Sequence, residues 1–263
     1  NTFSPLPTPI ESFARAGALS GPGAIKEAEA TNTSLGGFIE VARKAGAENA
    51  DALAVSGTAL SIEVRKGALE QAERSENVEI GLRVLMGWRQ ACVSASDTSA
   101  ATIQALAERA VAMAREAPED PHIGLADPRQ LASDRDAVAL DLADPGPEPE
   151  PAALEAWARE VEAAALSVTG IVQVEAAAAY GQRKLHLAGS NGFSGGYGRT
   201  MTSLSAVAFA GQGTDMQRDF AGESRTHAAD MPDPEWIGKL AADRTLQRVG
   251  SVKPRTGTFP VLY

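Results

Sequence analysis

The sequence contains few of the residues from which metal centres, disulfide frameworks and membrane spans are built. Its 263 residues include one cysteine and three histidines. No run of about 18 apolar residues occurs, so no membrane-spanning helix is expected. The single cysteine, Cys92, excludes an internal disulfide framework and a thiolate metal cage, and suits a reducing cytoplasm. Cys92 lies among small residues of a predicted strand, which favours a buried structural thiol over a nucleophile.

Basic residues are also in deficit. The chain has 24 lysines and arginines against 34 aspartates and glutamates, giving a formal net charge of −10. A field of this sign repels a phosphate backbone, so nucleic acid is not expected as a direct partner. Apolar residues make up 44 % of the chain and charged residues 22 %, which is typical of globular proteins.

Apolar residues in the first half follow a helical and then a strand period. They recur at helical spacing from Leu35 to Ala45, which predicts an amphipathic helix. Alternation with a period of two then predicts half-buried antiparallel strands, first around Leu60, Ile62 and Val64 and again over 78–86. A further helix is predicted after the N-cap candidates in "SDTS".

The second half repeats this order of elements. A helix is predicted from about Leu154 to Val168, and strands follow. Asp233 as N-cap, with proline at the next position, predicts the start of a last helix. The predicted fold class is therefore α+β, with two similar subdomains, each built of helices and an antiparallel sheet.

An acidic, proline-rich stretch separates the two halves. Seven prolines between positions 118 and 151 exclude regular structure through much of it and favour a stiff, solvated linker. The predicted division is a flexible N-terminal extension over 1–33, a first α+β subdomain over 34–117, the linker over 118–150, a second α+β subdomain over 151–252, and the start of a connection to an absent C-terminal domain over 253–263.

The histidines do not form a recognisable metal motif. A catalytic zinc site needs about three ligands on a rigid element, such as two histidines one helical turn apart. His122, His186 and His227 are far apart, and none is followed by glutamate. His186 alternates with two leucines, which predicts that it lies on the polar face of a strand. No catalytic residue and no metal ligand is therefore assigned.

The glycine-rich stretch "GSNGFSGGYGRT", residues 189–200, is the most unusual local feature. A phosphate-binding loop requires a following helix and, in the Walker case, a lysine. This loop has no lysine and precedes a predicted strand, while Asn191 and Gly192 form a strong turn signal. The prediction is a hairpin turn in which Asn191, Phe193 and Tyr197 are candidates to line a peptide or subunit surface.

Several segments together carry a family resemblance. "EDPHIGLADP", "GTDMQRDFAGESRTHAADMPDPEWIGKLAADRTLQRVGSV" and the glycine-rich stretch resemble the PmbA (TldE) branch of the TldD/PmbA family. The resemblance runs from about Leu35 to Tyr263. It implies a subunit of a bacterial cytoplasmic metallopeptidase-type complex that degrades or matures peptides, with a TldD-like subunit or a second copy as partner and unfolded peptides as substrate.

The resemblance also carries expectations about the metal. In TldD members an H-E-x-x-x-H motif lies in a C-terminal β-rich domain, shortly beyond the position that matches "FPVLY", and PmbA members generally lack it. This implies that the present chain is a non-catalytic N-terminal region without its own cofactor, and that zinc is held by a TldD-type partner. Family members also carry the name modulator of DNA gyrase. Because the negative charge disfavours direct contact with DNA, any link to gyrase is expected to be indirect.

Two other functions stay open at this point. One is an active metallopeptidase, with ligands in the absent C-terminal region or assembled from His186, His227 and acids such as Asp215 and Glu223. The other is an interaction module without proteolysis, acting on gyrase or on a toxin–antitoxin pair.

Overall fold

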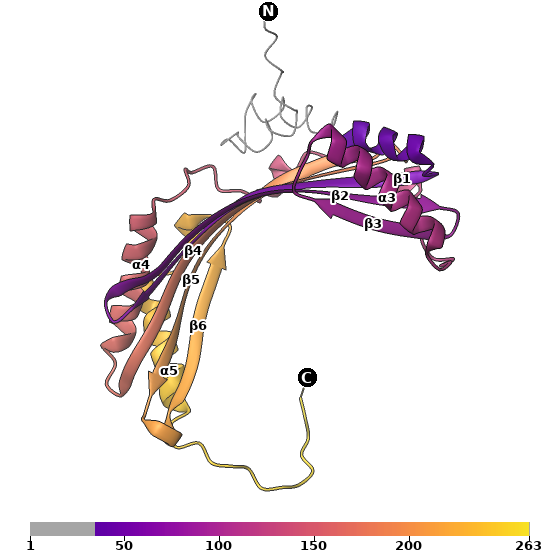
Figure 1. Ribbon diagram of the computed structural model, residues 1–263. Coiled ribbons are helices and arrows are strands. Elements are labelled where there is room, and N and C mark those ends of the chain that lie inside the picture. The colour runs from indigo at the N-terminus through magenta and orange to yellow at the C-terminus, as the bar shows by residue number, and fades with distance from the viewer. Residues whose placement is uncertain (1–34, 263) are drawn as a thin grey trace, which may run out of the picture.

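A single antiparallel sheet of six strands runs through the molecule in the computed structural model, which describes residues 35–262 (Figure 1). The strand order is β3-β2-β1-β4-β5-β6, so β1 and β4 lie at the centre. The strands are β1 Asn49–Arg65, β2 Ala68–Met86, β3 Arg89–Ala95, β4 Ile171–Gly189, β5 Ser194–Ala210 and β6 Gln217–Arg225. The predicted N-terminal extension, residues 1–33, lies outside the described residues.

Strands from the two halves of the sequence pair directly with each other. β1 and β4 are antiparallel neighbours, from Asp51 opposite Gly189 to Arg65 opposite Glu175. Both halves therefore contribute to one continuous sheet, although their helices cover different ends of it. The α+β class is confirmed, while the predicted subdomain boundaries stay a prediction.

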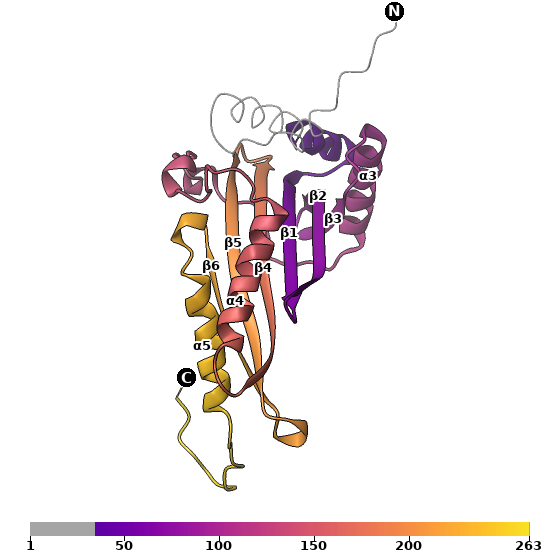
Figure 2. The ribbon, with the colours of Figure 1, turned by 90° about the vertical axis from the view of Figure 1, so that its left-hand side faces the viewer.

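The α-helices of residues 35–262 lie on the convex side of the curved sheet (Figures 1 and 2). One helix covers residues 35–45 of the described chain. The others are α3 Ala100–Glu116, α4 Pro151–Leu166 and α5 Pro234–Gln247. Within residues 35–262 no helix is long and apolar enough to cross a membrane.

Two hydrophobic clusters hold the helices to this side. The first joins the helix over 35–45 and α3 to one end of the sheet, and its large members include Phe38, Ile80 and Leu106. The second joins α4 and α5 to the other end, with Leu204 and Ile237 among its members. Burial of such side chains is the main favourable term in folding, so both ends of the sheet are stabilised from the convex side.

The helix starts follow the capping signals of the sequence. Ser99 caps α3, because its side chain accepts a hydrogen bond from the Thr102 N–H. Asp233 caps α5 in the same way through the Glu235 N–H, and Pro234 occupies the first turn. Both starts are confirmed, since these caps satisfy N–H groups that have no partner inside the helix.

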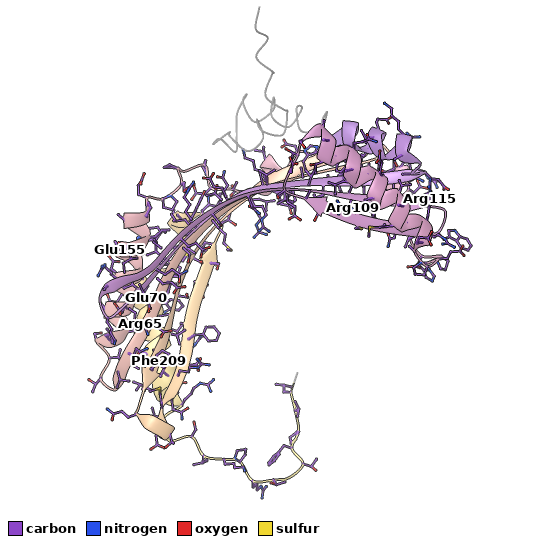
Figure 3. The ribbon with its side chains drawn as sticks, viewed as in Figure 1. Arg65, Glu70, Arg109, Arg115, Glu155 and Phe209 are labelled. Atoms are coloured by element: carbon purple, nitrogen blue, oxygen red, sulfur yellow. The ribbon has the colours of Figure 1, made fainter. Side chains whose placement is uncertain are left out.

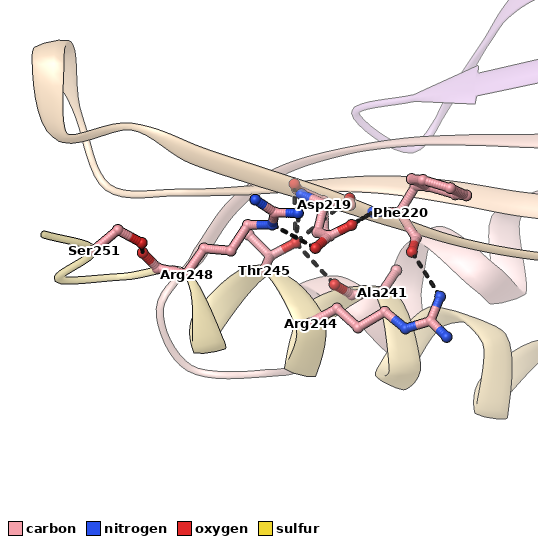
Figure 4. Close-up of polar contacts among 8 residues, drawn as sticks. Asp219, Phe220, Ala241, Arg244, Thr245, Arg248 and Ser251 are labelled. Atoms are coloured by element: carbon pink, nitrogen blue, oxygen red, sulfur yellow. Dashed lines mark hydrogen bonds and ion pairs between the residues drawn. The ribbon is translucent and has the colours of Figure 1, made fainter. Parts of the chain in front are cut away.

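Polar contacts tie α5 to the outer strands (Figure 4). The buried Thr245 hydroxyl accepts the Asp219 N–H at 3.1 Å and lies 3.1 Å from the Ala208 carbonyl oxygen, so it reaches both β6 and β5. Arg244 donates to the Phe220 carbonyl at 3.1 Å. These bonds fix the position of α5 on the convex face.

The proline-rich stretch is not a free spacer. It contains only two short 3₁₀ turns, Pro128–Gln130 and Val138–Leu140, in line with its prolines. Yet Thr200 of β5 holds it twice: the Thr200 N–H donates to the Leu142 carbonyl at 3.1 Å, and the Thr200 hydroxyl accepts the Asp144 N–H at 2.7 Å. Thr200 is buried, so the stretch forms part of the cover over the convex face.

Candidate functional site

The glycine-rich stretch forms the hairpin between β4 and β5, as its turn residues predict. The Gly189 N–H donates to the Phe193 carbonyl at 2.9 Å, and the Gly192 N–H donates to the Gly189 carbonyl at 3.1 Å. Gly192 has φ +89°, a conformation that L side chains rarely adopt. No helix follows the turn, so these N–H groups close a hairpin and do not face a phosphate.

Asn191 holds this turn to the proline-rich stretch. Its Nδ2 donates to the Ala126 carbonyl at 2.9 Å, and its Oδ1 accepts the Phe193 N–H at 3.2 Å. The polar atoms of the side chain are thus engaged within the chain. The structure therefore gives Asn191 a positioning contact, and its role at a binding surface stays a prediction.

Phe193 packs back onto the first glycine of β5. A Cβ added to Gly195 would lie 3.3 Å from Phe193 Cζ. The Arg135 guanidinium lies over the Phe193 ring, 5.2 Å from its centroid, and also donates to the Ser194 carbonyl at 3.0 Å. A cation–π contact of this kind adds to the burial of the ring, so Phe193 joins the turn, β5 and the proline-rich stretch.

Tyr197 is the most accessible of the three predicted residues, with 42 % of its surface exposed. It lies opposite Leu185 of β4, which in turn lies opposite Val55 of β1. Successive side chains of a strand point to opposite faces, and the next residues with even numbers, Thr200 and Thr202, are buried under the convex cover. Tyr197 therefore faces the concave side.

His186 lies on the convex side and not on the predicted polar face. Only 8 % of its surface is exposed, and its Nε2 lies 3.0 Å from Ser194 Oγ. A Cβ added to Gly196 would lie 2.8 Å from His186 Nδ1, so the glycine makes room for the ring. Burial lowers the pKa of His186 because a protonated ring loses hydration there.

The other histidines lie elsewhere and complete no metal site. His122 is exposed in the proline-rich stretch. His227 Nε2 lies 3.1 Å from Asp141 Oδ1. Among residues 35–262 no group of three His, Cys, Asp or Glu side chains lies close enough to hold a metal ion. The alternative set of His186, His227, Asp215 and Glu223 is therefore not assembled, and the described residues do not fit a catalytic metal.

Asp144 is a carboxylate with a clear structural role. Its Oδ2 accepts the Ala228 N–H and its Oδ1 accepts the Gly146 N–H, each at 2.8 Å. These backbone hydrogen bonds lower the pKa of Asp144, because they favour the ionised form. Asp144 thereby holds the proline-rich stretch to Ala228, in the segment that follows β6.

No helix covers the concave face of the sheet in the described part of the chain. Figure 3 shows its side chains on the inner side of the arc, whereas the labelled Arg109, Arg115 and Glu155 belong to the helices outside. Two arginines meet near its middle, since Arg183 of β4 lies directly opposite Arg199 of β5. Alternation places each arginine on a strand face, and the register of the β4–β5 hairpin brings the two together.

Cys92 also lies on this surface. It is exposed and opposite Arg83 in the ladder between β2 and β3. The prediction of a buried thiol is therefore wrong. The reason is that small neighbours do not specify which face of an edge strand is covered, and here Ala91 faces the helices.

Comparison with known proteins identifies the class. The sequence model of the PmbA/TldA metallopeptidase domain 1 matches residues 50–114, and that of the PmbA/TldA metallopeptidase central domain matches residues 144–249. Together these matches cover nearly all of the six strands and of α3, α4 and α5, whereas the helix over 35–45 lies outside them. The chain is thus a metallopeptidase-family protein by sequence and fold.

Two curated relatives carry the name PmbA. Metalloprotease PmbA of Escherichia coli O157:H7 is 32 % identical over 207 residues, which are 78 % of this chain and 46 % of that protein. Metalloprotease PmbA homolog of Haemophilus influenzae is 27 % identical, over 86 % of this chain and 49 % of that protein. The chain belongs to the PmbA/TldD family, and it spans about half the length of these relatives.

Solved structures share the fold. A candidate modulator of DNA gyrase from Bacteroides thetaiotaomicron superposes with a TM-score of 0.74 at 21 % identity, over 86 % of this chain and 51 % of that one. TldE from Thermococcus kodakarensis superposes with a TM-score of 0.64 at 13 % identity, over 81 % of this chain and 47 % of that one. At such identities the likeness extends to the fold alone.

Proposed function

We propose that this chain is the N-terminal region of a PmbA-like subunit in a cytoplasmic TldD/PmbA-type metallopeptidase complex that degrades or matures peptides. In this proposal a TldD-like partner, or a second copy of the chain, completes the assembly, and a zinc ion belongs to the TldD-type subunit. The present chain contributes a surface for the partner or for an unfolded peptide.

The observation that carries the proposal is the match to the PmbA/TldA domain sequences and to two proteins named metalloprotease PmbA. The donor set of residues 35–262 supports a non-catalytic role for this region, since it offers no three metal-ligating side chains together. The net charge of −10 argues against direct contact with DNA.

The test is to express the chain, in its full gene-encoded length, with and without a TldD-like subunit. We expect the two to co-elute and the complex to cleave a permanently unfolded polypeptide such as reduced, carboxymethylated α-lactalbumin. A chelator should abolish that cleavage, and the PmbA-like chain alone should show none. Chelator-sensitive cleavage by the chain alone would overturn the assignment of catalysis to the partner.

A further inference from the structure

The concave face has an uncompensated pair of positive charges near its centre. Arg183 and Arg199 are direct cross-strand neighbours. Across the sheet from Arg183, the next cross-strand partners are Gly57 of β1 and then Asn77 of β2. Both arginines are exposed. Neither forms an ion pair or a side-chain hydrogen bond with any residue between 35 and 262.

Such a pair is unfavourable for the folded chain itself. Like charges directly opposite on one face of a sheet destabilise it, and acidic residues to neutralise them are abundant in this chain. Another concave-face arginine is compensated in this way: Arg83 binds Asp51, its cross-strand neighbour. The arginines at 183 and 199 thus leave two guanidinium groups free to bind an external anion.

The surroundings of the pair are apolar on both sides along the strands. Tyr197 precedes Arg199 by two residues and Met201 follows it by two, and both are more than 40 % exposed. Because alternate residues share a face at about 3.3 Å per residue, the three side chains lie about 7 Å apart in a line. Gly57 and Gly181 flank this line and add no side chain to block it.

We propose that the surface made by Arg183, Arg199, Tyr197 and Met201, the arginine-pair surface, binds an extended acidic segment of another polypeptide. Carboxylates form two-point hydrogen bonds with guanidinium groups. An extended segment has the same spacing as the strand beneath it, so an apolar–x–acidic–x–apolar pattern places a carboxylate at the arginines and apolar side chains at Tyr197 and Met201. A small inorganic anion would leave these two apolar contacts unused.

The inference deepens the proposed function, on which it rests, by giving the class of peptide or partner segment that this face accepts. The probe is a fluorescein-labelled peptide of repeated Leu-Ser-Glu-Ser-Leu, with matched peptides that carry glutamine or lysine in place of glutamate. Anisotropy titrations of the full-length chain should show binding of the glutamate peptide that weakens with added salt, because salt screens exposed charges.

Substitution of the pair is the decisive step. Arg183→Gln with Arg199→Gln should weaken binding of the glutamate peptide at least about tenfold, since two charge-assisted contacts are lost. Arg43→Gln with Lys44→Gln removes the same charge from exposed positions on the helix over 35–45 and should leave binding within about twofold, since those positions lie outside the arginine-pair surface. Equal weakening by both double variants would show a net-charge effect and overturn the site.

Charge reversal gives an independent gain of function. Arg183→Glu with Arg199→Glu should prefer the lysine peptide over the glutamate peptide, and a thermal unfolding curve for each variant reports whether it is folded. A folded reversal variant with unchanged preference would contradict the proposal. Co-elution with the TldD-like subunit is scored separately: assembly without the predicted peptide preference refutes the arginine-pair surface alone, whereas the preference without assembly refutes the proposed function alone.

Discussion

The two faces of the sheet differ in what covers them and in what their residues do. The convex face carries the helices and the proline-rich stretch, and most of its strand residues are buried aliphatic side chains. The concave face is covered by no helix in the described chain, and it exposes Leu53, Leu187, Tyr197, Met201 and Phe220. The convex face therefore supplies folding stability, and the concave face is available for binding. Exposed apolar surface of this kind marks interaction sites.

The largest predicted effect is a difference in unfolding free energy between two truncations on opposite faces of β5. Leu204 is 1 % exposed on the convex face of β5, and Met201 is 44 % exposed on its concave face. Leu204→Ala should lower the free energy of unfolding by about 3 kcal/mol, because it leaves a cavity in the core. Met201→Ala should cost under about 1 kcal/mol, as is usual for surface positions. Urea unfolding monitored by circular dichroism measures both changes. Similar losses of unfolding free energy in the two variants would contradict the proposed difference between the faces.

A second prediction concerns the packing of α4 on α5 above the convex face. A Cβ added to Gly238 would lie 2.3 Å from the Val161 carbonyl oxygen and 3.0 Å from Ala164 Cβ. Gly238→Val should therefore destabilise the fold by about 2 kcal/mol through overpacking. Gly37→Val is the control, since its Cβ meets nothing within 4 Å, and a change within about 0.5 kcal/mol is expected. Equal shifts of the thermal unfolding midpoint in the two variants would contradict the close packing of α5 on α4 at Gly238.

The third prediction uses pH to test how the proline-rich stretch covers the convex face. The pKa of Asp144 lies below the ordinary 3.8, chiefly through the hydrogen bond from the Ala228 N–H. Above pH 3.8 the ionised group therefore stabilises the fold, and this contribution is lost as the pH falls through the lowered pKa. Asp144→Ala should cost about 1 kcal/mol at neutral pH, with the difference shrinking at acid pH.

The matched variant for that measurement is Asp230→Ala. Asp230 is exposed and forms no side-chain hydrogen bond or ion pair with the described residues. Its removal should leave the pH profile of the unfolding midpoint close to that of the unmodified chain. If Asp144→Ala gave the same profile as Asp230→Ala, the anchoring role of Asp144 would be refuted.

The smallest predicted effect has the opposite sign and lies on the concave face. Arg183→Gln with Arg199→Gln should raise the free energy of unfolding by a few tenths of a kcal/mol, because it relieves repulsion between cross-strand neighbours. Replicate denaturant titrations at low ionic strength resolve such a gain. A loss of more than about 1 kcal/mol would mean that the pair supports the fold, as buried or networked groups do.

Periodicity and capping signals in the sequence predict the local elements well. The apolar positions Leu35, Phe38, Leu60 and Ile62 are all buried, because a helix or a half-covered strand must turn its apolar side inward. The Asp233 cap is likewise local chemistry. The class α+β follows from these elements, and the structure confirms it.

The candidate site depends on contacts that no local pattern encodes. The β1–β4 ladder joins residues more than 100 positions apart in sequence, such as Asp51 and Gly189, so the sequence does not reveal the continuous sheet. The prediction that His186 lies on the polar strand face is wrong, because Gly196 leaves room for its ring on the covered side. The arginine pair depends on the register of β4 and β5, which turn geometry and burial set together.

The most direct test of the whole account compares the accessibility of the two faces in solution. In a Cys92→Ser background, Ala59→Cys places a thiol on the concave face one row from Arg183, and Glu160→Cys places one on the outer side of α4; both positions are exposed. Alkylation rates are measured for each thiol with and without the saturating glutamate peptide or the TldD-like subunit. The account predicts slower alkylation at position 59 and an unchanged rate at position 160. Protection at position 160 alone, or at neither position although binding is saturated, would contradict it.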